Sequence, residues 1–238
     1  MNYYHFNHKL VSDEQQSFVQ QLLDCKTFNG SDRLLGCAKG RGTTWFLNTQ
    51  AEFSVNSVLR HYYRGGLFGK FVKDRYWFNG NENTRAMKEF ALLQQLHRWN
   101  LPVPRPIAVK ITRQCCVYQA DILLEKIDET QDLSQYLQTQ SLTGEQYQQI
   151  GALIRQLHDH HVHHSDLNIH NILLDQQGKF WLIDFDKCRI QQGDGWKQAN
   201  LDRLLRSFHK ERQRLSIHFE VQDWKHLIAG YLQKTDTN

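Results

Sequence analysis

Two short segments of this chain carry oxygen-bearing side chains at a spacing that suits phosphoryl transfer. The first holds Asp166 and, five residues later, Asn171; the second begins with Asp184, thirteen residues after Asn171. An Asp in the first position can accept the proton of an attacking hydroxyl. Asn and Asp oxygens are ligands that Mg²⁺ accepts in proteins. The spacing therefore predicts Asp166 as the catalytic residue and Asn171 and Asp184 as magnesium ligands.

The residues between the two segments predict the hairpin that would bring them together. Residues 172–183 form an apolar run, a turn around Gly178 and a second apolar run, which is typical of two antiparallel strands. Pairing of these strands would return Asp184 to the side of Asn171.

The same residues resemble the catalytic loop H-R-D-L-x-x-x-N and the D-F-G triplet of protein kinases, with two departures. Ser165 replaces the Arg, and Asp186 replaces the Gly. Asp186 adds a carboxylate that could be a further metal ligand. With Ser165, the chain lacks the Arg that binds the phosphorylated activation loop in regulated protein kinases, so we expect constitutive activity.

A glycine pair in the N-terminal half is placed where phosphates could approach the backbone. Gly40 and Gly42 lie between two predicted strands, residues 34–38 and 44–47. Glycine has no Cβ to keep an anion away from backbone N–H groups. Alone the pair predicts only a turn, but its position upstream of the catalytic segment suits the phosphate-binding loop of a kinase.

A cation and an acid are expected to pair beside the nucleotide. A predicted strand carries Arg60 where kinases carry Lys, and the helical pattern over residues 82–99 offers Glu89 as its partner, with Glu82 as the alternative. Because the Arg fork binds oxygens differently from Lys, the phosphate-binding role could instead fall to Lys70 or Lys73.

The three prolines of residues 101–106 end this helix and predict an extended connector. Strands are predicted after it, at 107–110 and 116–126. Residues 121–127 resemble a kinase hinge, where the backbone around Glu125 and Ile127 would contact adenine. An edge strand without a ligand is the alternative.

Histidines are concentrated between His158 and His164. Such density suggests a transition-metal site, yet no zinc-ligand spacing such as H-E-x-x-H is present. The favoured interpretation is a set of solvated imidazoles at the end of a helix.

Composition indicates a globular protein in a reducing compartment. The 238 residues carry a formal net charge of +4, too small an excess to indicate a nucleic-acid partner, and five cysteines, an odd number. No secretory signal and no stretch of about 20 apolar residues is visible. Membrane association would therefore be peripheral, and an amphipathic helix near residues 12–23 is expected to pack on the protein itself.

The pattern of elements predicts an α+β, two-lobed protein-kinase-like fold. A small β-rich N-lobe would span residues 1–125, and a reduced, mainly helical C-lobe residues 126–238. Helices are expected at 133–137, 145–158, around 201–208 and at 221–231. Only 54 residues follow Asp184, without an A-P-E triplet, which favours a small molecule, sugar or lipid head group over a peptide as substrate.

Six segments together resemble the 3-deoxy-D-manno-octulosonic acid (Kdo) kinases of lipopolysaccharide assembly. The resemblance covers residues 36–212 and includes an Arg-Gly-Gly block that a generic kinase would not share. The segments are 40–45, 59–67, 89–90 with 101–106, 164–171, 184–186 and 200–207.

The resemblance implies phosphorylation of the Kdo 4-hydroxyl on a lipid A precursor, with ATP and Mg²⁺ as cofactors. It implies a peripheral protein at the cytoplasmic face of a Gram-negative inner membrane. Arg64 and Lys70, in a basic and aromatic stretch, could then bind substrate anions at a lipid interface, with a solvated loop as the alternative. A kinase for another small alcohol and a nucleotide-binding pseudokinase scaffold remain open.

Overall fold

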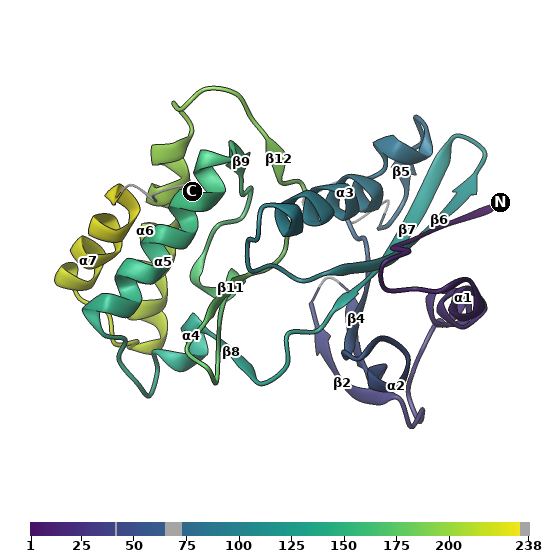
Figure 1. The fold of residues 1–238 in the computed structure, drawn as a ribbon, viewed down its shortest axis with the longest axis horizontal. Helices are drawn as coiled ribbons and strands as arrows, with labels where there is room; N and C mark the ends of the chain where they lie inside the picture. Colours follow the sequence, from purple (N-terminus) through teal and green to yellow (C-terminus); the bar gives the residue numbers. More distant parts are fainter. Residues whose placement is uncertain (41, 65–72, 234–238) are drawn as a thin grey trace. The chain divides into compact units, whose positions relative to one another are not determined.

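The structure is a computed structural model that describes residues 1–40, 42–64 and 73–233 (Figure 1). Its contacts divide the chain into two compact units. The first comprises Met1–Gln95 with Pro104–Asp128, and the second Leu96–Val103 with the chain from Glu129 onward. The predicted division after residue 125 falls three residues before the end of the first unit. The sequence did not predict that residues 96–103 belong to the second unit.

The first unit is built on a seven-stranded antiparallel sheet in the order β1-β6-β7-β4-β3-β2, with β5 paired to β7. All the strands predicted in this region are present, whereas β1 and β5 were not predicted. The strands are β1 (Asn2–Phe6), β2 (Leu34–Lys39), β3 (Thr43–Leu47), β4 (Ser57–His61), β5 (Tyr76–Trp77), β6 (Pro106–Gln114) and β7 (Val117–Glu125).

Helices of the first unit cover this sheet. The N-terminal helix is confirmed, with a capping box between Ser12 and Gln15 and with Val19, Leu22 and Leu23 buried in the unit's core. Its apolar face therefore packs on the protein itself, as expected. The helices are η1 (Asp13–Gln15), α1 (Gln16–Asp24), α2 (Gln50–Phe53), η3 (Asn81–Asn83) and α3 (Arg85–Arg98), the last of which runs into the second unit.

The second unit is mainly helical, and the predicted hairpin is confirmed within it. Strands β10 and β11 pair antiparallel beside β8, and β12 pairs with β9. The helices are α4 (Leu133–Tyr136), α5 (Gly144–Asp159), η4 (Ile169–Asn171), α6 (Lys197–Leu215) and α7 (Val221–Leu232). The strands are β8 (Thr130–Asp132), β9 (Val162–His163), β10 (Ile172–Asp175), β11 (Phe180–Leu182) and β12 (Arg189–Ile190).

Helices α5 and α7 approach closely because each has a glycine at the crossing point. A Cβ on Gly151 would lie 1.9 Å from the carbonyl oxygen of Leu227, and one on Gly230 would lie 2.0 Å from that of Gln148. Next to this contact, Tyr147 lies against the rings of Phe208 and Phe219, which stack at 4.4 Å between centroids. The two glycines thus set the spacing on which the aromatic core of this unit depends.

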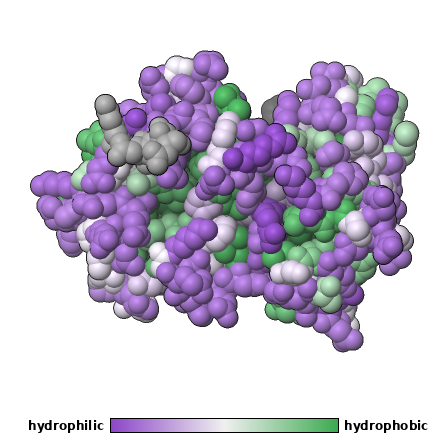
Figure 2. All heavy atoms as spheres, viewed as in Figure 1, coloured by the Kyte–Doolittle hydropathy of each residue, from purple (hydrophilic) through white to green (hydrophobic). Residues whose placement is uncertain are grey.

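The surface gives no sign of a membrane-crossing element in the described part of the chain. No helix there is both long enough and apolar enough to span a bilayer. Figure 2 shows a face that is largely hydrophilic, with hydrophobic residues gathered in patches between the polar ones. The large apolar side chains that are most exposed are far apart in the sequence, and two of them lie at the two ends of α7: Met1, Leu35, Trp77, Ile190, Val221 and Leu232.

Replacement of Gly151 by Ala should destabilise the second unit. Alanine normally favours a helix interior by up to about 1 kcal/mol, but here its methyl group would push α7 away. We expect a net loss of about 1–3 kcal/mol in the free energy of unfolding, measured by chemical denaturation. Gly195→Ala is the control, since a Cβ there meets nothing within 4 Å. Equal stability of the two variants would contradict a tight α5–α7 contact.

Candidate active site

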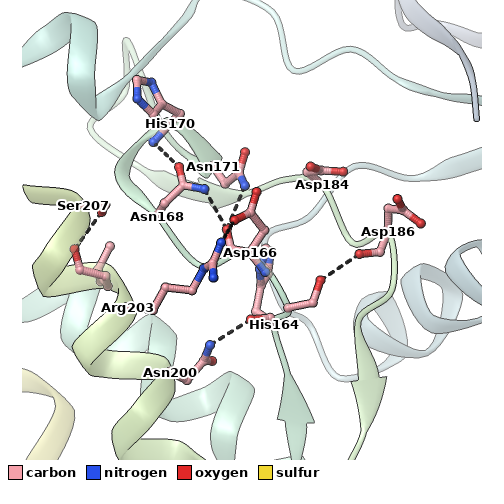
Figure 3. Close-up of polar contacts among 12 residues, drawn as sticks. His164, Asp166, Asn168, His170, Asn171, Asp184, Asp186, Asn200, Arg203 and Ser207 are labelled. Carbon is pink, nitrogen blue, oxygen red and sulfur yellow. Dashed lines mark hydrogen bonds and ion pairs between the residues drawn. The ribbon is translucent and has the colours of Figure 1, made fainter. Parts of the chain in front are cut away.

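The segment between β9 and β10 folds into a loop held by its own amide side chains (Figure 3). The carbonyl oxygen of Asp166 accepts hydrogen bonds from the side-chain nitrogens of Asn168, at 2.8 Å, and of Asn171, at 2.9 Å. The side-chain oxygen of Asn168 in turn accepts from the backbone N–H of His170. Two side chains thus fix the backbone at Asp166, whose carboxylate is about half exposed.

The hairpin brings Asp184 to this loop as predicted. Beyond the strand pairing of β10 and β11, the backbone N–H of Ile183 donates to the carbonyl oxygen of Asn171 at 3.0 Å. Asp184 adopts a left-handed backbone conformation with φ of 63°, which Asp tolerates better than most residues. The chain therefore turns sharply at the predicted metal ligand.

The side-chain amide of Asn171 is oriented for a cation. Its nitrogen donates to Asp166, so its oxygen is the atom left to accept a positive partner. Asp166, Asn171 and Asp184 lie on neighbouring loops in Figure 3. The structure thus brings together the three residues that the sequence predicted for chemistry, although their roles stay predictions.

Side chains on one face of α6 hold the catalytic loop through hydrogen bonds and an ion pair. Asn200 donates to the carbonyl oxygen of His164 at 2.8 Å, Ser207 accepts from the backbone N–H of Ile169 at 3.2 Å, and Arg203 forms an ion pair with Asp166. Positions 200, 203 and 207 lie on the same side of a helix. The sequence predicted a helix here and a resemblance, but no contact with the catalytic loop. The signal that was missed is three polar residues at helical spacing.

The interpretation of the histidine cluster as solvated imidazoles is wrong for two of its members. His158 and His164 are fully buried. The ring of His164 donates to the carbonyl oxygen of Ile183 at 3.1 Å and accepts from the backbone N–H of Asp166 at 3.3 Å. Burial lowers the pKa of His164, so the neutral ring joins the two loops.

His158 joins three helices. The side-chain nitrogen of Asn200 donates to the carbonyl oxygen of His164. The side-chain oxygen of Asn200 therefore accepts the hydrogen bond from Nε2 of His158, at 3.0 Å. The other ring nitrogen then accepts from the hydroxyl of Tyr231 on α7, at 2.9 Å. Burial lowers the pKa of His158 to about 4. Within the described residues no three His, Cys, Asp or Glu side chains are grouped to hold a metal ion, so the transition-metal alternative gains no support.

Ser165 holds the segment that follows Asp184. Its hydroxyl donates to the carbonyl oxygen of Asp186 at 2.9 Å, and its backbone N–H lies 3.3 Å from the sulfur of Cys188. A neutral side chain therefore braces this segment where a protein kinase carries Arg. The role of Asp186 as a further metal ligand stays a prediction.

The predicted ion pair of the first unit is confirmed, and Glu82 as the alternative acid is wrong. Arg60 on β4 contacts both carboxylate oxygens of Glu89 on α3, at 2.5 and 2.7 Å, and Tyr62 donates to the same carboxylate at 2.5 Å. Glu89 is almost fully buried, whereas Glu82 is exposed in η3. Burial, together with the charge of Glu89, raises the pKa of Tyr62 well above its usual value, so this hydroxyl remains a donor.

The predicted glycine turn joins β2 and β3, and the backbone N–H of Gly40 donates to the carbonyl oxygen of Gly42 at 2.9 Å. A Cβ on Gly42 would lie 1.8 Å from the ring of Tyr63. Glycine is thus required here by the packing of an aromatic ring, a reason that the sequence did not reveal. Contact of Gly40 and Gly42 with phosphates stays a prediction.

The predicted hinge is the end of β7. Glu125 forms a two-point ion pair with Arg105, at 2.9 and 3.0 Å, and its backbone N–H donates to the carbonyl oxygen of the same residue. The N–H of Lys126 donates to Asn56. These two N–H groups are therefore used within the first unit. Adenine contacts at Glu125 and Ile127 stay a prediction.

Of the two predicted substrate-binding cations, Lys70 lies outside the described residues. Arg64 is half-buried, donates to the carbonyl oxygen of Arg75 at 2.6 Å and lies over the ring of Tyr76 at 4.8 Å. Lys73, the other residue considered for phosphates, is exposed. Arg64 is thus held in place, and its role in binding substrate is untested.

These features define a class of protein. An acid in a loop ahead of an Asn, a hairpin returning a second Asp, and a buried Arg–Glu pair on a separate β-rich unit are the parts of a protein-kinase-like phosphotransferase. The model of the lipopolysaccharide kinase (Kdo/WaaP) family matches residues 28–231. The chain belongs to this family, and its two-lobed kinase-like fold is the one predicted.

Curated relatives match almost the whole chain. A protein named 3-deoxy-D-manno-octulosonic acid kinase from Haemophilus influenzae (strain 86-028NP) is 52% identical over 237 residues, which cover 97% of this chain and 96% of the relative. One of the same name from Mannheimia succiniciproducens is 49% identical, covering 95% and 97%. Another from Vibrio vulnificus (strain YJ016) is 51% identical, covering 88% of each.

The charge state of His158 should make stability depend on pH. The unfolded ring binds a proton near pH 6.5 and the folded ring only near pH 4. The stabilisation from the neutral ring is therefore fully present above pH 6.5. As the pH falls to about 4, the free energy of unfolding decreases by about 3 kcal/mol. We expect the difference in unfolding free energy between the wild type and His158→Gln to shrink by this amount over that range. A difference that stays constant from pH 7 to pH 4 would refute the neutral, buried ring.

Proposed function

We propose that this protein transfers the γ-phosphoryl group of ATP to the 4-hydroxyl of Kdo on a lipid A precursor. The observation that carries the proposal is the meeting of Asp166, Asn171 and Asp184 in two adjoining loops of one unit. Family membership supports the choice of acceptor, because the relatives at about 50% identity are named for this sugar acid.

The proposed reaction is a simple displacement. The acceptor oxygen forms a bond to the γ-phosphorus, the bond from that phosphorus to ADP breaks, and Asp166 takes the proton of the hydroxyl. Because the transition state is charged and makes few covalent demands, positioning and charge neutralisation supply most of the rate. The half-exposed carboxylate of Asp166, held by its braced backbone, is suited to orient an incoming hydroxyl.

The oxygens of Asn171 and Asp184 suit Mg²⁺, which binds through one or two protein oxygens together with phosphates and water. Bound there, the ion would neutralise charge on the ATP phosphates. In the first unit, the Arg60–Glu89 pair fixes the guanidinium that the sequence predicts for nucleotide binding. Since Arg remains charged under all ordinary conditions, this cation does not depend on pH.

A peripheral position at the cytoplasmic face of the inner membrane belongs to the same proposal. It is supported by the lipid nature of the proposed acceptor and by the absence of a membrane-spanning helix in the described ranges.

Two alternative functions would give different products in an assay with ATP and the glycolipid. A kinase for another alcohol would modify that compound and not the glycolipid, and a pseudokinase would bind ATP without turnover.

Asp166→Asn should abolish most turnover and spare nucleotide binding. Loss of the proton acceptor typically lowers kcat by about 10²–10⁴-fold, while the affinity for a fluorescent ATP analogue should stay within about twofold. The assay is incubation with ATP, Mg²⁺ and Kdo-bearing lipid A precursor, with mass spectrometry for one added phosphate. Near-normal turnover would overturn the role of Asp166, and an unmodified glycolipid with the wild type would overturn the function.

Arg64→Ala should raise the KM for the glycolipid and leave the KM for ATP unchanged, because its guanidinium is fixed by the backbone of Arg75 and is proposed to meet a substrate anion. Loss of one charged hydrogen bond corresponds to roughly tenfold or more. Arg206→Ala, an exposed arginine on α6, is the charge-matched control. A glycolipid KM equal to that of the control variant would remove Arg64 from the substrate site.

A further inference from the structure

An exposed arginine lies on the catalytic Asp. Nη2 of Arg203 forms an ion pair with Oδ1 of Asp166, and the side chains of the two residues are 47% and 45% exposed. Exposed pairs of this kind contribute little to stability, typically less than about 1 kcal/mol. Stability alone therefore gives a weak reason for a cation at this position.

The position of the guanidinium is set by the helix that carries it. Arg203 lies between Asn200 and Ser207, both of which hydrogen-bond to the backbone of the loop. Its Cα is thus fixed relative to Asp166, while the long side chain stays in solvent. In Figure 3 it approaches Asp166 from the side of α6, whereas Asp184 lies on the other side. The guanidinium is therefore placed away from Asp184.

Most of the hydrogen-bonding capacity of Arg203 is unused in the described structure. A guanidinium has five N–H donors in a planar fork, and the ion pair occupies one nitrogen. Asp166 is the only hydrogen-bond or ion-pair partner of this side chain within the described ranges. Nη2 belongs to both two-point edges of the guanidinium, Nε/Nη2 and Nη1/Nη2, and carries two N–H groups. With one of these groups on Asp166, the other edge can still donate to a second anion in the two-point geometry that arginine forms with carboxylates.

We propose that Arg203 binds the carboxylate of the sugar acceptor while Asp166 holds the hydroxyl that is phosphorylated. The inference rests on the proposed function, in which the acceptor is a sugar acid. A single guanidinium would then set the distance between the carboxylate and the reacting oxygen, so neutral sugars would lose both affinity and alignment. Without an acceptor, the same guanidinium is paired with Asp166.

The test combines a protein change with a substrate change. Wild type, Arg203→Ala and Arg203→Lys are assayed with a Kdo-bearing glycolipid and with its analogue in which the sugar carboxylate is a carboxamide of nearly the same size. Arg206→Ala removes the same charge one turn further along α6 and is the control. The KM for ATP and the melting temperature are measured for each protein.

We expect the wild type to lose roughly tenfold to a hundredfold in kcat/KM when the carboxylate becomes an amide. Arg203→Ala should show a similar loss with the acid and almost no further loss with the amide. Arg203→Lys should recover part of the activity on the acid, since it keeps the charge without the fork. Arg206→Ala should behave as the wild type on both acceptors.

Three results overturn the proposal, and they are distinguishable. If the losses in kcat/KM caused by Arg203→Ala and by the carboxamide acceptor multiply in an active enzyme, Arg203 acts on Asp166 alone and does not contact the carboxylate. An increase in the KM for ATP would lead to the same conclusion by placing Arg203 on the nucleotide. If the wild type leaves the glycolipid unmodified, the proposed function itself fails and the carboxylate ligand fails with it.

Discussion

The geometry of the catalytic loop depends on hydrogen bonds from one face of α6. The loop contains only the single turn η4 as regular structure, too little to fix a side chain by itself. Helix α6 is 19 residues long and is anchored by the buried residues Leu201, Leu204 and Phe208. Neighbouring positions on the helix reach the loop through Asn200 and Ser207. The long, packed helix therefore adds to the hydrogen bonds by which Asn168 and Asn171 hold the backbone at Asp166.

The buried imidazole of His158 extends this dependence to α5 and α7. Its two nitrogens bond to Asn200 and Tyr231, and in the neutral ring Nε2 donates to Asn200 while Nδ1 accepts from Tyr231. A protonated ring would carry a buried charge and would require the hydroxyl of Tyr231 to accept instead of donate. The packing of the C-terminal helices and the position of the catalytic loop are thus joined through one uncharged side chain.

Local patterns in the sequence predicted much of this site, and tertiary contacts account for what they missed. The β10–β11 hairpin followed from alternating apolar runs, which act over a few residues. The Arg60–Glu89 pair followed from the kinase pattern of a strand cation paired with an acid on the next helix. The burial of His158 did not, since a run of histidines has the same composition whether it faces water or a core. The requirement for Gly42 was equally hidden, because it arises from the ring of Tyr63, which follows β4 and is distant in the sequence.

The replacement of Arg by Ser165 changes what can keep the site ordered. An Arg at this position is a cation that needs a partner, and in regulated kinases a phosphate added to a distant loop supplies one. Ser165 instead donates a neutral hydrogen bond to the carbonyl oxygen of Asp186, two residues after Asp184. That bond forms from groups already present in the chain. The order of the predicted metal-binding segment therefore needs no added charge, which is the physical basis for expecting activity without a modification step.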